Sequence, residues 1–167
     1  PHNVFGERQN IRDPYRNVVG IFINRIMQGK PPVVYGSGNQ IRAFTHIDNL
    51  TPCLLRAGFD EVSGEIFNIG PTEGYTINDL AERLLVLFDS KLRPEHVNDR
   101  PLEVKWATCT VDKAEKMLGY KTIVSFDEGL MRMATWAKEL GPQQFKYLDD
   151  LEIVNNKTPQ TWKNKTI

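Results

Sequence analysis

The residues that could carry out chemistry in this 167-residue sequence are few, and their spacing does not fit the common catalytic arrangements. His2, His46 and His96 are well separated, and with two distant cysteines they form no pattern typical of a zinc site. No tyrosine is followed by a lysine four residues later, and no G-x-S-x-G stretch occurs. Neither G-x-G-x-x-G nor G-x-x-G-x-x-G is present, so no dinucleotide pyrophosphate loop is predicted. We therefore expect no catalytic, metal-binding or cofactor-binding residue within these 167 residues.

The charge balance restricts the ligands that the chain could bind. The sequence holds 21 lysines and arginines against 21 aspartates and glutamates, so its formal net charge is zero. Such a chain lacks the electrostatic footprint of a nucleic-acid-binding protein. Any bound anion must then be held by a few placed cations. Arginine suits this role because its planar fork meets phosphate oxygens with two hydrogen bonds.

The composition is typical of one ordinary globular domain. Hydrophobic residues make up 40% and charged residues 25%, which is enough to build a core. No apolar run approaches the ~20 residues of a membrane span, so no membrane association is expected. Cys53 and Cys109 suggest no disulfide framework, and a reducing cytoplasm is the simplest interpretation.

Apolar periodicity and capping residues predict five helices, which must position any binding residues. They cover approximately residues 18–27, 49–58, 77–88, 111–118 and 126–140. Four of the helix starts are expected at Asp48, at Thr110 and at two capping boxes, Thr76 with Asp79 and Ser125 with Glu128. Short strands are expected at residues 33–35, 42–47, 65–69 and 102–106.

This set of elements makes a poor stand-alone sheet, because sheets usually carry ~4–6 strands. The expected fold class is therefore α/β, with mixed short strands and helices, incomplete as an independent fold. Residues 1–141 are expected to form one lobe, in which Trp106 and Trp136 belong to the core. Residues 142–167 are expected to be a tail that packs on a surface through Phe145, Tyr147, Leu151, Ile153 and Trp162.

Three segments, in this order and spacing, carry a resemblance to a known family. Residues 1–9 (PHNVFGERQ) are similar to an N-V-Y-G-P stretch, and residues 34–48 (VYGSGNQIRAFTHID) to a G-D-G-x-Q-x-R-D-F-x-H-V-x-D block. The third runs from residues 67–70 through 76–80 to 112–120. The sequence thus resembles, over about residues 1–140, the extended short-chain dehydrogenase/reductase family of NAD-dependent nucleotide-sugar epimerases and dehydratases. The resemblance is to members like UDP-glucose 4-epimerase.

The resemblance implies that the chain is the carboxy-terminal, substrate-binding portion of an extended Rossmann-type enzyme. In this family the amino-terminal part supplies the dinucleotide fold and a catalytic tyrosine and lysine. NAD would then be bound mainly by that part, and a nucleotide sugar would be the substrate. The complete enzyme is expected to be a cytoplasmic homodimer.

Five residues are carried over as substrate-binding candidates. Arg42 lies where the family places an arginine that faces the nucleotide diphosphate. Arg100 resembles a later family arginine, although Leu102 and Glu103 replace the G-D pair that follows it. Asn3 corresponds to an asparagine beside the diphosphate or the sugar, and Val34 and Tyr35 to residues near the base. His46 is expected to have a structural role.

Three interpretations stay open at this stage. The chain is the substrate lobe of a nucleotide-sugar 4-epimerase, the lobe of a 4,6-dehydratase, or a catalytically silent module that binds a nucleotide sugar or a partner. Coding sequence ahead of Pro1 with a glycine-rich loop and Y-x-x-x-K would favour an enzyme, and a start codon near Pro1 would favour the silent module. The sequence does not name the sugar or the base.

Overall fold

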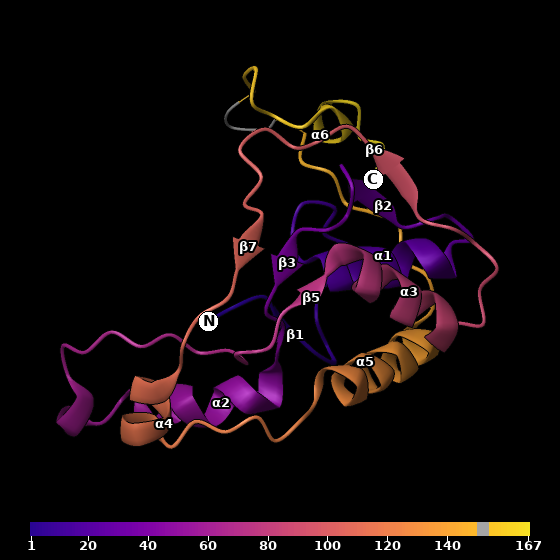
Figure 1. The fold of residues 1–167 in the computed structure, drawn as a ribbon. Coiled ribbons are helices and arrows are strands. Elements are labelled where there is room, and N and C mark those ends of the chain that lie inside the picture. Colours follow the sequence, from indigo (N-terminus) through magenta and orange to yellow (C-terminus); the bar gives the residue numbers. More distant parts are fainter. Residues whose placement is uncertain (150–153) are drawn as a thin grey trace.

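The computed structural model describes residues 1–149 and 154–167, and shows a mixed α/β fold of helices and very short strands (Figure 1). The expected fold class is therefore confirmed. Leu151 and Ile153, two of the expected tail anchors, lie outside the described residues.

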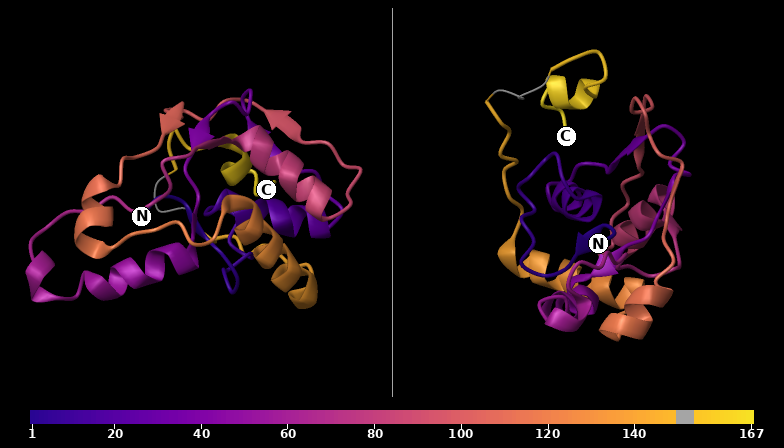
Figure 2. Two further views of the ribbon diagram at one scale, coloured as in Figure 1. Left: turned by 60° about the horizontal axis from the view of Figure 1, so that its bottom comes forward. Right: turned by 90° about the vertical axis from the view of Figure 1, so that its left-hand side faces the viewer.

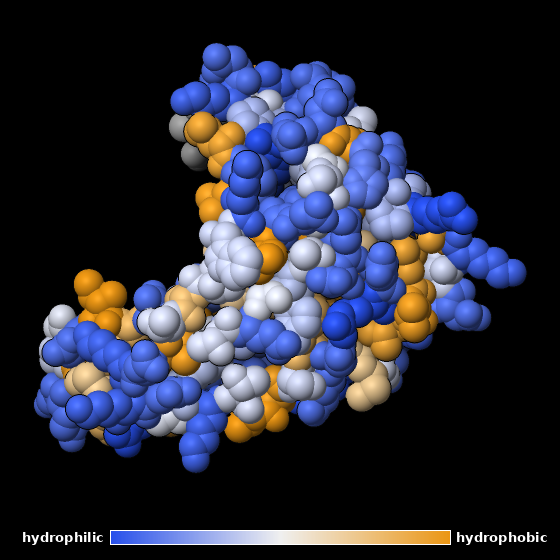
Figure 3. Space-filling view, viewed as in Figure 1, coloured by the Kyte–Doolittle hydropathy of each residue, from blue (hydrophilic) through white to orange (hydrophobic). Residues whose placement is uncertain are grey.

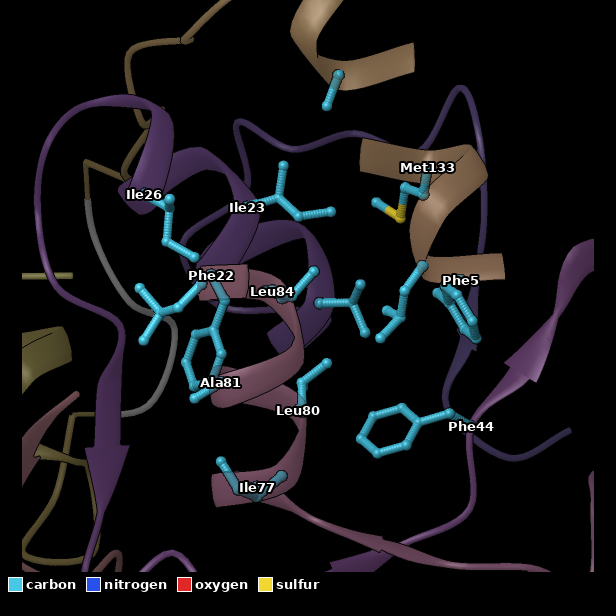
Figure 4. Packing of buried hydrophobic residues seen from close by; sticks show 14 of the residues in the cluster. Phe5, Phe22, Ile23, Ile26, Phe44, Ile77, Leu80, Ala81, Leu84 and Met133 are labelled. Atoms are coloured by element: carbon cyan, nitrogen blue, oxygen red, sulfur yellow. The ribbon is translucent and has the colours of Figure 1, made fainter. Parts of the chain in front are cut away.

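Three helices form the main body of the molecule. They are α1 (Val18–Met27), α3 (Ile77–Leu87) and α5 (Phe126–Leu140), and all three lie where they were predicted. Figure 4 shows their buried side chains meeting in one core, with Phe22 and Ile23 from α1, Leu80 and Leu84 from α3 and Met133 from α5. Each of these five side chains is at most 1% exposed, so this cluster is the principal source of hydrophobic stabilisation.

Local capping chemistry fixes where these helices begin. Thr76 and Asp79 form a complete capping box, in which each side chain accepts a hydrogen bond from the other residue's backbone N–H. Ser125 accepts from the backbone N–H of Glu128, which is one half of the second predicted box. Asn17 caps α1 in a left-handed conformation, with φ 62°.

A second, smaller core lies in an arm that extends from the main body (Figures 1 and 2). It is built by α2 (Ile47–Arg56), by the 3-10 turn η1 (Asp60–Val62) and by α4 (Asp112–Leu118). Leu50 and Cys53 of α2 pack there with Ala114 and Leu118 of α4. As predicted, α4 ends at Gly119, which has the left-handed conformation that favours glycine.

The strands of the described residues form three separate small sheets. β1 (Val4–Phe5) pairs in parallel with β4 (Thr45–His46), and β2 (Val33–Tyr35) pairs in parallel with β6 (Glu95–Val97). β3 (Ile41–Arg42) lies between antiparallel β5 (Tyr75–Thr76) and parallel β7 (Trp106–Ala107). No described strand exceeds three residues, so the helices must hold these pairs in place.

Several strand predictions were wrong. Residues 42–47 are divided between β3 and β4, because Ala43 and Phe44 are both buried and so break the alternation of a single strand. Residues 65–69 form no strand. Leu102 has φ 62°, which no strand accommodates, and the strand in that region starts only at Trp106. The predicted core position of Trp106 is also wrong, since its side chain is 66% exposed.

Two predicted helix caps were wrong as well. The cap of α2 is His46, whose Nδ1 accepts a hydrogen bond from the backbone N–H of Asp48 at 3.3 Å. Asp48 instead lies in the first turn, where its charge favours the positive end of the helix dipole. The cap of α4 is Val111 rather than Thr110, and it makes no side-chain cap bond.

The tail returns across the main body. Asn24 of α1 and Gln143 exchange hydrogen bonds of 2.9 Å, and Lys146 donates its backbone N–H to the carbonyl of Arg12. The chain ends in a one-turn helix, α6 (Gln160–Lys163), which lies above β2 in Figure 1. Ile167 is 7% exposed, so the last residue is packed rather than free.

The surface is mixed in character. Figure 3 shows small apolar patches separated by polar side chains on the face seen in Figure 1. Exposed large apolar residues occur at the end of α2 and in the segment after it, at Leu54, Leu55, Phe59 and Ile66. No helix in the described part of the chain is both long enough and apolar enough to cross a membrane.

We predict that Thr76→Ala lowers the free energy of unfolding by about 1 kcal/mol, because it removes the cap of α3. The hydrogen bond from Thr76 also holds the pKa of Asp79 below its usual value, so the variant should raise that pKa. Urea denaturation at pH 7 would measure the loss. Thr135→Ala, at an exposed position inside α5, is the matched control and should cost little. Equal losses in the two variants would contradict the capping interpretation.

Candidate functional site

A pocket of about 210 Å³ brings together four of the five substrate-binding candidates. Asn3, Tyr35, Arg42 and Arg100 all line it, although they come from three separate parts of the sequence. Val34 does not line the pocket. Its side chain is fully buried in the main core, and the neighbouring Val33 lines the pocket instead. The alternation of side chains along a strand explains this difference.

The turn between β2 and β3 sets two of these residues in place. Gly38 has φ +76°, and a β-carbon there would lie 2.0 Å from Oδ1 of Asn78, so the turn requires glycine. Asn78 donates its backbone N–H to the carbonyl of Gly38 at 3.1 Å, which ties the turn to the start of α3. Gln40 donates through Nε2 to the carbonyl of Tyr35 at 3.1 Å. Tyr35 and Arg42 are thereby fixed at the two ends of one turn.

Arg42 is held by two acceptors of the chain itself. Its Nη1 donates to the carbonyl of Ile41 at 2.8 Å, and its Nη2 forms an ion pair with the carboxylate of Glu103. The Arg42 side chain is only 15% exposed, so its direction is largely determined. Glu103 lines the same pocket and was not identified from the sequence as a partner of Arg42. The 61-residue separation between the two gave no local signal.

Arg100 is held by aromatic faces. Its guanidinium lies 5.2 Å from the ring centre of Tyr35 and 5.1 Å from that of Trp162. Its contact with a carboxylate is longer than that of Arg42, since Nε of Arg100 lies 3.8 Å from Oε2 of Glu103. Trp162 was expected only as a tail anchor, and the sequence offers no periodic pattern that would place it in the pocket.

Asn3 joins the amino-terminal segment to the strand region. It has φ 36°, a left-handed conformation that asparagine tolerates better than most residues. Its Nδ2 donates to the carbonyl of Ala43 at 2.8 Å, next to Arg42. The Nδ2 group of Asn3 therefore holds the amino-terminal segment against the strand region at the edge of the pocket.

The lining suits anion binding better than proton transfer. Its charged side chains are Arg42, Arg100 and Glu103, and aromatic rings of Tyr15, Tyr35 and Trp162 form much of the wall. Low-polarity walls strengthen the attraction between an arginine and a bound anion. Within the described residues, no group of three or more His, Cys, Asp or Glu side chains could hold a metal ion.

His46 and Glu7 belong to a separate ion-pair network. The His46 ring is buried, and its Nε2 lies 3.0 Å from Oε2 of Glu7. Arg132 of α5 joins the network, with Nε 2.7 Å from Glu7 and Nη2 2.8 Å from Asp48. Partial burial raises the pKa of Glu7, but hydrogen bonds from its own backbone, Arg132 and His46 outweigh it and leave the pKa below its usual value. This network ties the segment after β1 to β4, α2 and α5, which agrees with a structural role for His46.

Comparison with known proteins relates the chain to one enzyme family. Residues 1–70 match the sequence profile of the NAD dependent epimerase/dehydratase family. A putative UDP-glucose 4-epimerase of Methanocaldococcus jannaschii is 30% identical over 137 residues, which cover 81% of this chain and 43% of that protein. A UDP-N-acetyl-alpha-D-glucosaminuronate decarboxylase of Bacillus cytotoxicus is 29% identical over 144 residues, covering 83% and 44%.

The fold is also shared with solved structures. The UDP-glucuronic acid 4-epimerase of Bacillus cereus, in complex with UDP-glucuronic acid and NAD, matches with a TM-score of 0.75 and 28% identity. The match covers 83% of this chain and 44% of the epimerase. The chain thus spans less than half the length of the relatives that it matches.

We predict that Arg132→Met makes the stability of the chain less dependent on acid pH. A carboxylate whose folded pKa is depressed contributes stability above its unfolded pKa of about 4.3, and this contribution is lost as the pH falls through the folded pKa. Since Arg132 helps to lower the pKa of Glu7, the wild type should lose more stability than the variant between pH 7 and pH ~3. Urea denaturation at both pH values would measure this, with Arg56→Met on the exposed face of α2 as the control. The same pH dependence in all three proteins would disprove the assignment.

Proposed function

This chain is related to the NAD dependent epimerase/dehydratase family, and we propose that it forms the nucleotide-sugar-binding lobe of a UDP-sugar 4-epimerase. In this proposal residues 1–141 are the lobe, and residues 142–167 are a tail that packs on it. The substrate is a nucleotide sugar held through its diphosphate.

The convergence of Asn3, Tyr35, Arg42 and Arg100 on one pocket carries the proposal. These four residues come from three separate parts of the sequence, since Tyr35 and Arg42 share one motif block, Asn3 precedes it and Arg100 follows it. The pocket combines two arginines with aromatic walls, which is the chemistry expected for a nucleoside diphosphate. The complexes of relatives with UDP-sugars support the same ligand class.

The size of the pocket supports a shared site. Ligand pockets usually measure ~300–1,000 Å³, whereas this one measures about 210 Å³. A nucleotide sugar would therefore extend beyond the walls that this chain supplies. In the proposed enzyme, further residues outside these 167 would complete the site around the sugar ring.

The division of labour between binding and chemistry follows from the residues present. The sequence has no glycine-rich dinucleotide loop, and the described strands form no sheet larger than three strands, so the residues of this chain do not fit NAD. We therefore assign to this chain no reaction step that involves NAD. Its own residues would grip the diphosphate and leave the sugar ring free to present either face to a reactive centre.

One alternative within the family is supported by a specific relative. The decarboxylase of Bacillus cytotoxicus matches this chain about as well as the epimerases do. Because the described pocket binds the part of the substrate that these enzymes share, its geometry suits either reaction. A 4,6-dehydratase and a catalytically silent binding module are the remaining alternatives.

We predict that Arg42→Ala weakens UDP binding about ten- to a hundredfold, because it removes a charge-assisted hydrogen bond worth ~1.5–3 kcal/mol. Arg42→Lys should recover little of this, since an ammonium group cannot reproduce the paired fork. Arg100→Ala should cost less, because its sequence motif departs from that of the family. Isothermal titration of UDP against each protein would measure the affinities.

Arg56→Ala is the matched control, because Arg56 is exposed and lies outside the pocket. Its affinity for UDP should equal that of the wild type. If Arg42→Ala also binds UDP as tightly as the wild type, then the substrate site has been placed wrongly.

We also predict that the purified 167-residue chain, with NAD added, does not turn over UDP-glucose or UDP-glucuronic acid. The reason is that its sequence contains neither the dinucleotide loop nor a tyrosine with a lysine four residues later. Chromatographic detection of the 4-epimer would test this. Measurable epimer formation above a no-protein blank would refute the proposal that this chain binds the substrate but does not carry out the reaction.

A further inference from the structure

The end of the chain forms one wall of the pocket described above. Trp162 and Ile167 line it, and the hydroxyl of Tyr35 makes a hydrogen bond with the hydroxyl of Thr161. Two further contacts hold this segment in position. The hydroxyl of Tyr147 donates to the carbonyl of Ile167 at 2.7 Å, and Tyr15 packs edge-on against Trp162 with the ring centres 5.3 Å apart. The wall is therefore built by several independent contacts.

The contacts of Arg100 join this wall to β2. The guanidinium group lies within 5.2 Å of the ring centres of both Tyr35 and Trp162, so two aromatic residues hold one cation. Tyr35 and Trp162 come from opposite ends of the sequence, and both side chains are half-buried. Removal of Trp162 would leave Arg100 with a single aromatic contact and the 3.8 Å approach to Glu103.

Such contacts position an arginine without using up its hydrogen-bond donors. A cation over a ring is attracted through the face of the guanidinium, whereas the N–H donors lie in the guanidinium plane. Arg100 can therefore keep its aromatic contacts and still donate to phosphate oxygens. Fixing the side chain beforehand also reduces the conformational entropy that is lost when a ligand binds.

We propose that Trp162 is a positioning residue of the nucleotide-sugar site, which holds Arg100 in place to bind the diphosphate of a nucleoside diphosphate. The inference rests on the proposed function and adds the tail to that site. The lobe formed by residues 1–141 is then incomplete for phosphate binding without the last turn of the chain.

The test is a double-mutant cycle with UDP as the ligand, measured by isothermal titration on the full 167-residue chain. Trp162→Ala should weaken UDP binding about three- to thirtyfold, which corresponds to the loss of one cation–π contact. Arg100→Ala should weaken it as well, and the Arg100→Ala/Trp162→Ala double variant should bind no more weakly than Arg100→Ala alone. Uridine, which lacks phosphates, should bind the wild type and Trp162→Ala equally.

Three controls separate positioning from a general structural role. Trp106→Ala removes an exposed tryptophan outside the pocket and should leave the UDP affinity unchanged. Trp162→Phe keeps an aromatic face and should restore most of the affinity. If Trp162→Ala does not fold, Trp162→Leu, which removes the aromatic face but keeps an apolar side chain, replaces it in the cycle. In a Trp106→Phe background, UDP should change the fluorescence of the chain, and Trp162→Phe should abolish that change.

The outcomes distinguish the two claims. UDP binding by the wild type with no loss in Trp162→Ala, or with additive losses in the double variant, overturns the role of Trp162 and leaves the proposed function standing. An equal loss of uridine affinity would show that Trp162 contacts the base instead, which also overturns the inference. No UDP binding by the wild type overturns the proposed function, and the inference with it.

Discussion

The close approach of α5 to the β1–β4 pair is the constraint on which the remaining arrangement depends. A β-carbon at Gly129 would lie 2.9 Å from both the His46 ring and the Phe5 ring, so only glycine lets the helix pack at this distance. Phe5 then packs edge-on against Phe126 at 5.9 Å, which joins the strand pair to the main core. With β1 and β4 fixed, the segments that flank them bring Asn3 and Ala43 into contact at the pocket edge.

The two pocket arginines are held by different kinds of force, and this gives them different properties. Arg42 is paired with a carboxylate, so an incoming phosphate must compete with Glu103 or share the guanidinium with it. Arg100 is held through its faces by aromatic rings, and its contact with Glu103 is 3.8 Å long. Its N–H donors are therefore available to a phosphate without the loss of a close ion pair like that of Arg42. In a chain of zero net charge, such local placement substitutes for a broad positive field.

Features that depend on local chemistry, such as the helices, were predicted correctly from the sequence. Features that depend on contacts between distant segments, such as the strands, were predicted poorly. All five predicted helices exist, because apolar periodicity and caps such as Thr76 with Asp79 act within one or two turns. The same reasoning placed strands poorly, since β6 and β7 are defined by pairing with β2 and β3, more than 60 residues away. At the site, family motifs pointed to Arg42 and Arg100, but the partners Glu103 and Trp162 follow only from the three-dimensional contacts.

The parallel strand pairs have a consequence for how the chain reaches its native state. β1 with β4, β2 with β6, and β3 with β7 each join segments that are separated by whole helices. Closing such long loops costs chain entropy before the strand pairs contribute any stability, whereas each helix can form from neighbouring residues. We therefore expect the helical core to assemble early and the pocket walls, including the returning chain end, to be completed late. Substitutions in those walls are then expected to change mainly the rate of unfolding, and hardly the rate of folding.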